Sequence, residues 1–368
     1  MARKGERVMI KVKGKGGITA KIIADSVSSV SGDRITTFEL EYHRYIHGEF
    51  MTHRVFSRNA ASSRAIPVKN MLELVRNSPA MPIHWGKNQA GMQAKKECDV
   101  PLGFDQELSN GWKSTKYLSN VASWKSGADN AAILAEKFSE AGYHKQIVNR
   151  LVEPFQMIKV VVTATSFDNF FWLRFHEDAQ PEIAELARCM LVAYKRSRPQ
   201  VLHPGEWHLP FVYSERYEDG LKYYQQDEDG QMFFIDTEDA LKLSASCCAQ
   251  VSYRKSDNSL EKAETVWERL VASQPVHASP TEHQATPMQS PEGFIIVHTE
   301  QGWHNEFEKG VTGRLLDTAS GNLSSGMSNN FKGWIQHRAL IANNVCTEYD
   351  YSQDVDEQGL EITDEEAA

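Results

Sequence analysis

Several features that define large protein classes are missing from this chain of 368 residues. It has no run of about 18 apolar residues, the length a membrane-spanning helix needs, and the start of the chain lacks the apolar core of a signal peptide. The five cysteines form no C-x-x-C pair, which argues against a zinc site and fits a reducing compartment. We therefore expect a cytoplasmic protein with no membrane partner and no bound metal.

The common nucleotide-binding motifs are absent as well. No G-x-G-x-x-G and no G-x-x-x-x-G-K-[ST] occurs, so neither a Rossmann fingerprint nor a Walker phosphate loop is predicted. His277 and His283 enclose Glu282, but Pro280 interrupts the segment and the spacing does not suit a helical metal pair. This loop is predicted either to cap a helix or to contact a ligand.

Basic charge is not in excess, since the net charge is −9. Nine of the acidic residues lie in 348–368, which holds no Lys or Arg, so the rest of the chain has 40 basic and 40 acidic residues. Such a segment is typical of a solvated, mobile tail. Because binding to a nucleic-acid backbone draws on many cations, no nucleic-acid partner is expected.

The apolar patterns predict a mixed α/β (α+β) protein. Strands are expected over 18–25, 34–42 and 158–165, a short helix over 70–76, and helical structure over 105–152 with breaks near Gly127 and Gly142. Ser166 is a candidate N-cap, a helix follows Asp178, and 218–239 reads as a hairpin before helices over 238–253 and 259–273. The expected segments are 1–216, an acidic hairpin linker 217–240, 241–346, and a tail 347–368.

The most informative stretch that is present covers residues 50–67. It combines cations, hydroxyls and one amide, and no acidic residue interrupts 50–72. Arginine offers a planar fork of donors, and serine hydroxyls add short-range donors, so the composition suits a phosphate or another oxyanion. A basic surface turn closed by Pro67 is the alternative interpretation.

Two further features bear on chemistry. Arg174 lies inside the apolar run 169–175, so it must be paired, extend its charge to solvent, or face a ligand cavity. Glu177 and Asp178 are the simplest partners. Cys247 and Cys248 have no cation beside them in the sequence, which predicts buried structural thiols rather than nucleophiles.

Together these segments resemble the flavin-dependent thymidylate synthases. The family signature is Arg-His-Arg-x-x-Ser-x-Asn-Glu-x-Ser-x-Arg, and residues 52–64 match six of its eight positions with His53, Arg54, Ser57, Asn59, Ser62 and Arg64. Further matches to the family's second half, in the same order, are Ala141-Gly142, Arg150 with Pro154, the segment 169–174, and Ala179-Gln180-x-Glu182-Ile183.

The order of the motifs is unusual for that family. A helix with an Ala-Ala-Arg-x-Ser-Tyr signature and a His-x-Ser/Thr-Pro-Phe-Glu-His loop normally precede the arginine motif. Here the similar segments 249–253 and 277–283 follow it. The chain therefore resembles a circularly permuted, phage-like member, in which one site could still assemble from segments distant in sequence. The segment 322–338 also resembles parts of longer phage-type members.

The resemblance implies a homotetramer of subunits with a mixed sheet flanked by helices and long insertions, binding FAD and dUMP at subunit interfaces. The implied reaction makes dTMP from dUMP, with methylenetetrahydrofolate as carbon donor and NADPH as reductant, and without attack by an enzymic cysteine. Arg174 would be catalytic, lying against the pyrimidine and favouring its ionised N3 form. The implied contacts are Ser62, Arg64, Arg150, Arg174 and Glu49 for dUMP, and His53, Arg54, Ser57, Asn59, Asn169, His277 and Ser279 for FAD.

The departures from the family pattern leave other functions open. Thr52 replaces the first arginine of the signature, Ala60 replaces its glutamate, Glu49 stands where glutamine is usual, and Thr163-x-Thr165 lies near the position of an Asn-x-Arg pair. A related flavin and folate enzyme that hydroxymethylates dUMP is one alternative, and a non-catalytic nucleotide-binding homologue is another. The neutral body of the chain disfavours modification of uracil within a polynucleotide.

Overall fold

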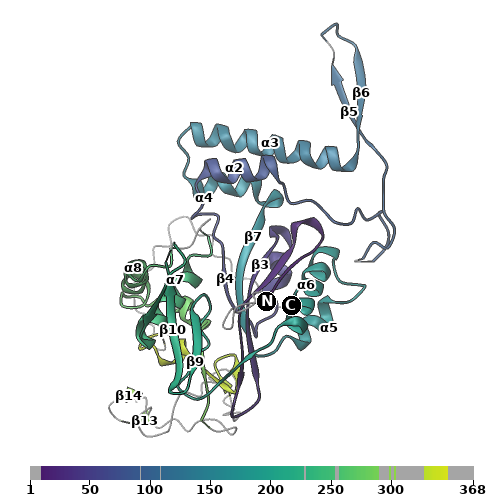
Figure 1. Cartoon of the computed structure of the whole chain (residues 1–368). Coiled ribbons are helices and arrows are strands. Elements are labelled where there is room, and N and C mark those ends of the chain that lie inside the picture. The colour runs from purple at the N-terminus through teal and green to yellow at the C-terminus, as the bar shows by residue number, and fades with distance from the viewer. Residues whose placement is uncertain are drawn as a thin grey trace, which may run out of the picture.

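The computed structural model describes residues 10–91, 93–107, 109–227, 229–252, 257–289, 298–299, 302–303 and 327–346. Over these residues the protein is a mixed α+β structure with eight α-helices and several antiparallel sheets, the largest of six strands (Figure 1). The same residues include no helix long and apolar enough to cross a membrane. The tail predicted over 347–368 lies outside them.

The main sheet has the order β1-β2-β3-β7-β4, and β8 pairs with β2. Its pairs are antiparallel except for the parallel β2–β8 pair. Gly32, with φ of +73°, lies in the turn between β2 and β3. Strands predicted over 18–25, 34–42 and 158–165 are therefore confirmed. The bounds are β1 Lys11–Lys13, β2 Thr19–Ser28, β3 Arg34–His43, β4 Ser57–Ala60, β7 Met157–Ala164 and β8 Gln200–Leu202.

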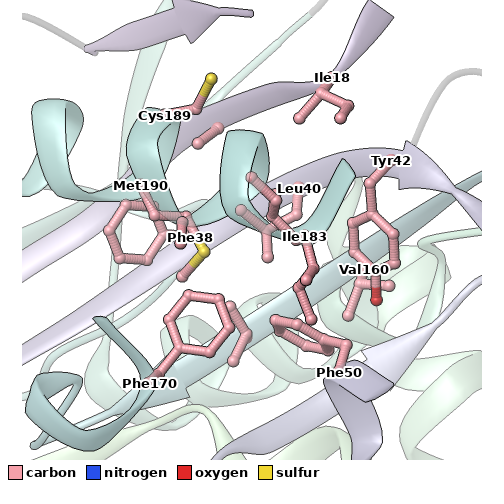
Figure 2. Packing of buried hydrophobic residues seen from close by; sticks show 14 of the residues in the cluster. Ile18, Phe38, Leu40, Tyr42, Phe50, Val160, Phe170, Ile183, Cys189 and Met190 are labelled. Atoms are coloured by element: carbon pink, nitrogen blue, oxygen red, sulfur yellow. The ribbon is translucent and has the colours of Figure 1, made fainter. Parts of the chain in front are cut away.

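One face of this sheet carries the apolar core. Alternate residues of β3 and β7, including Phe38, Leu40 and Val160, are fully buried beneath α5 (Asp168–Arg174) and α6 (Pro181–Arg196). Ile183 and Met190 of α6 point toward these strand residues (Figure 2). The helix predicted after Asp178 is thus confirmed. It begins with Pro181 and Glu182 and ends with Lys195 and Arg196, the charge arrangement that the helix dipole favours.

The opposite face of the sheet is covered by the second half of the chain, partly through an apolar cluster around Trp334. A buried series of side chains crosses it: Ser26 Oγ lies 2.9 Å from His208 Nδ1, whose Nε2 lies 2.8 Å from Thr37 Oγ1. Thr37 Oγ1 lies 2.7 Å from Thr163 Oγ1, which in turn lies 2.9 Å from His283 Nδ1. We call this series the polar chain. It fixes the second half against the sheet, because each buried polar group needs its partner.

The second half forms its own small sheet and helices. Tyr223 and Ile235 of the three-stranded sheet pack on Leu243 and Cys247 of α7. The hairpin and both helices predicted here are confirmed, and the division at 217–240 stays a prediction. The elements are β9 Tyr213–Tyr217, β10 Gly220–Gln226, β11 Met232–Ile235, α7 Thr237–Ala249, α8 Leu260–Leu270, the 3-10 turns η4 Ser279–Glu282 and η6 His337–Leu340, and the strands β12 Ala285–Pro287, β13 His298–Thr299, β14 Gly302–Trp303, β15 Met327–Ser328, β16 Phe331–Lys332 and β17 Trp334–Gln336.

A group of helices lies beyond one end of β7 (Figure 1). It comprises α2 (Val68–Asn77), α3 (Asn120–Glu140), α4 (Lys145–Val148) and the 3-10 turn η3 (Asn149–Phe155), which share a separate apolar cluster. The helix predicted over 70–76 is confirmed. Shorter elements elsewhere are α1 His47–Met51 and the 3-10 turns η1 Lys15–Gly17 and η2 Arg44–Ile46.

Three local expectations are wrong. Residues 105–118 are not helical, because β5 (Leu102–Glu107) and β6 (Lys113–Leu118) pair as a hairpin that projects from the body (Figure 1). Helix α3 runs through Gly127 without a break, since its buried alanines pack on α2 and η3. Ser166 is not an N-cap: α5 begins one residue later, after Phe167, and the Ser166 hydroxyl donates to Asp168 instead.

Buried histidines predict that the fold is sensitive to acid. Burial lowers the pKa of His283 to about 3 and that of His337 to about 4, from 6.5. Below pH 6.5 the unfolded chain therefore binds protons that the folded chain does not, so the free energy of unfolding should fall steadily from pH 6.5 toward pH 4. Urea denaturation at a series of pH values measures this slope.

The matched variants are His283→Asn and His277→Asn, since His277 is exposed. His283→Asn should lower stability at neutral pH but make the acid slope shallower, whereas His277→Asn should leave the slope unchanged. An equal slope in the wild type and His283→Asn would contradict this assignment.

Candidate functional site

The arginine motif runs along the edge of the main sheet. Helix α1 ends at Met51, a short loop leads into β4 on the edge of the sheet, and a second loop leads into α2. Because β4 is extended, Ser57 and Ser62 lie on the order of 16 Å apart. The candidate residues are thus divided between the two ends of one strand, with a middle group between them.

At the first end, Arg174 binds the motif itself. Its Nε donates to His53 Nε2 over 3.0 Å, and its Nη2 donates to Thr52 Oγ1 over 3.2 Å. The expected partners Glu177 and Asp178 make no such contact with it among the described residues. Thr52, where the family has an arginine, therefore takes part directly in holding Arg174.

His53 is neutral at this end of the site. Its ring is 6% exposed and lies edge-on to Phe170, while Phe56 stacks on it. Burial, together with the charges of Arg174 and Arg58, lowers the pKa of His53 to about 4. A neutral imidazole accepts a hydrogen bond through Nε2 but carries no negative charge. The positive charge of Arg174 therefore stays available to stabilise another negatively charged group.

The remaining candidate residues at this end lie around Arg174 and His53. Arg54 and Asn169 are exposed, Arg54 on the loop after α1 and Asn169 in the first turn of α5. Glu49 is half-buried in α1, and its backbone carbonyl accepts from the Thr52 hydroxyl over 2.7 Å. Arg58 donates to the carbonyls of Met51 and His53. Two of these four side chains are cations and one is a carboxylate.

In the middle group, Ser57 and Asn59 join the motif to the second half. Ser57 is 1% exposed, and its Oγ accepts from Gln336 Nε2 over 2.9 Å. Gln336 Nε2 also lies 3.0 Å from the Glu282 carbonyl, and Asn59 Nδ2 donates to the Cys248 carbonyl over 3.3 Å. A bound ligand could reach Ser57 only if Gln336 moved. The structure therefore gives Ser57 and Asn59 a positioning role.

At the other end, Ser62 begins a basic surface. Its backbone N–H donates to Ser252 Oγ over 2.8 Å, and its own Oγ accepts from the Arg64 N–H over 3.3 Å. Arg64 and Arg150 are exposed. Lys145 Nζ lies 3.5 Å from the Ala65 carbonyl, which adds another cation to the same loop.

One carboxyl group organises this basic surface. Glu153 Oε1 accepts from Ser63 Oγ over 3.3 Å and pairs with Arg44 at 3.0 Å and Arg150 at 3.4 Å. A single carboxylate cannot neutralise two guanidinium groups, so positive charge remains beside Ser62. This end of the strand is suited to an anion such as a phosphate.

The loop 277–283 lies against the edge strand of the main sheet and a helix of the second half. Turn η4 contacts β4 and α7, and His277 and Ser279 are exposed on it. Glu282 forms an ion pair with Arg338, and burial raises the pKa of Glu282 although Arg338 opposes that shift. The loop is therefore anchored on the inner side while its candidate ligand contacts face outward.

The structure brings some of the predicted residues together and keeps others apart. The motif, Ser252 and η4 meet within one chain, although they lie far apart in the sequence. Arg174 and the pair Arg64 and Arg150 lie at opposite ends of β4, so the predicted dUMP contacts are not all gathered in one chain. Gln336 and Asn330, whose side-chain amides donate to Ser57 Oγ, belong to the segment 322–338. The resemblance of that segment to phage-type members was the only signal for them.

Two further observations concern catalysis by a cysteine nucleophile and catalysis by a bound metal ion. Burial raises the pKa of Cys247 to about 12 and raises that of Cys248 strongly, so neither thiol is an activated nucleophile. Across the part of the chain that the structure describes, no group of three or more His, Cys, Asp or Glu side chains is placed to hold a metal ion. Tyr253, part of the late signature, lies outside that part.

Comparison with known proteins adds no relative: no family model and no curated protein matches this chain.

The amide of Gln336 is predicted to hold the site together. Gln336→Leu keeps the volume of the side chain but leaves Ser57 Oγ and the Glu282 carbonyl without this donor, which should lower the free energy of unfolding by about 1–3 kcal/mol. Chemical denaturation measures the change. The exposed Gln231→Leu is the control and should have little effect; a Gln336→Leu protein as stable as this control would refute the role.

Proposed function

We propose that this chain is an FAD-dependent thymidylate synthase with permuted motif order, converting dUMP to dTMP with methylenetetrahydrofolate as carbon donor and NADPH as reductant. The observation that carries the proposal is the meeting of the arginine motif with both late signature segments. Ser62 N–H binds Ser252, Asn59 binds the carbonyl of Cys248, and β4 contacts η4. Chance similarity of short polar strings gives no reason for these three segments to converge.

The substrate phosphate is assigned to the basic surface at Ser62. Ser62, Arg64 and Arg150 supply a hydroxyl and two exposed guanidinium groups, and Lys145 adds a cation nearby. Charge-assisted hydrogen bonds to a phosphate are stronger than those between neutral groups. Glu153 orients Arg150 without removing its charge, because it is shared with Arg44.

Arg174 is assigned to the pyrimidine. Its guanidinium is held by a neutral histidine and a hydroxyl rather than by a carboxylate, so it can stabilise negative charge that develops on the ring as C5 becomes nucleophilic. Because Arg174 and Arg64 lie at opposite ends of β4, one dUMP molecule would contact both types of residue only where two subunits meet. The exposed Trp172 and Phe175 beside Arg174 suit such an interface, which supports a homotetramer with shared sites.

The residues present fit an FAD molecule in part. Arg54 and Asn169 are exposed, as are His277 and Ser279 on the loop against β4, and no acidic residue lies between 50 and 72 to repel a diphosphate. His53 is buried and holds Arg174, and Ser57 and Asn59 position the loops behind it. When bound, the flavin would supply the redox chemistry that side chains cannot.

A second candidate is hydroxymethylation of dUMP by the same cofactors. It is favoured by Thr52, whose hydroxyl replaces a cation of the family signature and contacts Arg174. Such a change beside the pyrimidine could alter how the transferred carbon unit is reduced. A non-catalytic nucleotide-binding protein is the remaining alternative, favoured by the loss of the signature glutamate at Ala60.

The deciding experiment is anaerobic incubation of the purified protein with FAD, dUMP, methylenetetrahydrofolate and NADPH. We expect flavin reduction by NADPH, reoxidation on turnover, and a product with the mass of dTMP. A product heavier by one oxygen atom would establish the hydroxymethylating alternative. Protein that neither retains FAD nor changes dUMP would overturn both enzymatic proposals.

Two arginine variants separate binding from chemistry. Arg64→Ala should raise the KM for dUMP roughly 10- to 100-fold with a smaller effect on kcat, because it removes charged hydrogen bonds to a phosphate. Arg174→Ala should lower kcat roughly 10²- to 10³-fold, because it removes charge stabilisation at the ring. Arg76→Ala, at an exposed position of α2, is the control for loss of a surface arginine. Unchanged kinetics in both test variants would refute the assignments.

A further inference from the structure

The β5–β6 hairpin stands clear of the body as a ribbon of two strands (Figure 1). Among the described residues, no third strand pairs with either of its edges, and none of the buried apolar clusters includes a residue of this ribbon. A two-stranded hairpin is at best marginally stable by itself in water. A ribbon that is not packed on its own chain therefore calls for a partner.

Large apolar side chains are exposed along the ribbon. Trp112 is 72% exposed and Tyr117 is 69% exposed, and Leu102 and Phe104 are each 44% exposed. Leu102 lies opposite Leu118, on the face of the ribbon that Phe104 also occupies. Exposed apolar side chains beside unpaired strand edges are typical of an interaction surface.

The charges of the ribbon indicate what kind of partner it fits. β5 carries Asp105 and Glu107, and β6 carries Lys113 and Lys116, so residues 102–118 have no net charge. Glu107 lies opposite Lys113, and Asp105 accepts a hydrogen bond from the Thr115 hydroxyl over 2.8 Å. This balance disfavours a nucleic acid or an anionic membrane, both of which select an excess of cations. It suits a partner with the same balance.

We infer that β6 pairs with β6 of a second copy of this chain, so that the two hairpins form one four-stranded antiparallel sheet. A twofold axis makes such a strand antiparallel to its own copy. With Thr115 on the axis, Lys113 lies opposite Tyr117 of the second copy, and Trp112 lies opposite its Leu118. Each cation then faces an aromatic ring and each exposed indole faces an apolar side chain, and both kinds of cross-strand pair are favourable.

Other ways of pairing the two ribbons are less favourable. If the register shifts by one residue so that Lys116 lies on the axis, two ammonium groups face each other. A shift by one residue in the other direction separates Trp112 from Leu118. The outer edge of β5 is a poorer edge, because it contains Gly103 and follows Pro101, which has no backbone N–H.

This interface is independent of the proposed activity and of the surface around Arg174. It leaves the exposed Trp172 and Phe175 uncovered, so it adds to any contact that those residues make. Pairing through one strand edge buries less than the roughly 1,200 Å² of a standard protein interface. The association should therefore be reversible at micromolar concentrations of the protein.

The first test changes the charge at one position and measures association of the full chain by sedimentation equilibrium over roughly 1–100 μM. Tyr117→Lys places two lysines opposite each other on both sides of the axis, and we expect it to raise the dissociation constant of this interface at least about tenfold. Tyr117→Glu should retain the association, because the new carboxylate would face Lys113 of the second copy. Gln106→Lys adds the same charge on exposed β5 and is the matched control, which should associate as the wild type does.

The second test fixes the register. Thr115→Cys should form a disulfide with its own copy under mild oxidation, because residues directly opposite each other in an antiparallel pair have Cβ atoms about 4.5–5.5 Å apart. Gln106→Cys should not. Mass spectrometry of the linked peptides separates a 115–115 link from links made by the native cysteines, such as the exposed Cys346.

Several outcomes would overturn the inference. A wild-type protein that is monomeric over the whole concentration range would do so, as would equal association of Tyr117→Lys and Tyr117→Glu. The same holds if Gln106→Lys weakens association as much as Tyr117→Lys does, or if a cysteine at 106 is cross-linked as readily as one at 115. Thermal unfolding of each variant shows that the body of the protein is folded.

Discussion

The hydrogen-bonded polar chain from Ser26 to His283 is the interaction on which the rest of the molecule depends. It lies beside a small apolar cluster around Trp334 on the same face of the main sheet, so the covering layer must supply polar partners at defined positions. Thr37 and Thr163 each bind a histidine from the second half, His208 and His283 respectively. An apolar layer could slide over a sheet at little cost, whereas this one holds a single position because displacement would leave buried groups unsatisfied.

That single position sets the geometry of the candidate site. With His283 fixed on Thr163, turn η4 lies against β4, and Gln336 can reach Ser57. The motif is then clamped in the middle of β4, and its two ends remain free to present unneutralised cations. The Arg174 end offers a guanidinium without a carboxylate, and the Ser62 end offers several cations around one shared carboxylate.

Elements with a strong local pattern could be predicted from the sequence, and contacts between distant segments could not. Strands β2, β3 and β7 and helix α6 follow directly from their apolar periodicity. The β5–β6 hairpin could not be found in this way, because its exposed residues carry no pattern of burial. The motif residues were recognisable, but the separation of Arg174 from Arg64 depends on how β4 lies.

The contact between Ser57 and Gln336 spans 279 residues and has a consequence for the order of synthesis. At ribosomal rates of about 5–20 residues per second, the arginine motif would wait on the order of 15 to 55 seconds before its clamp emerges. A chain with the opposite motif order would complete this contact much sooner. During that interval the face of the nascent sheet that the second half covers stays open, so the order of segments in this chain lengthens the time in which the partly made protein is exposed to solvent.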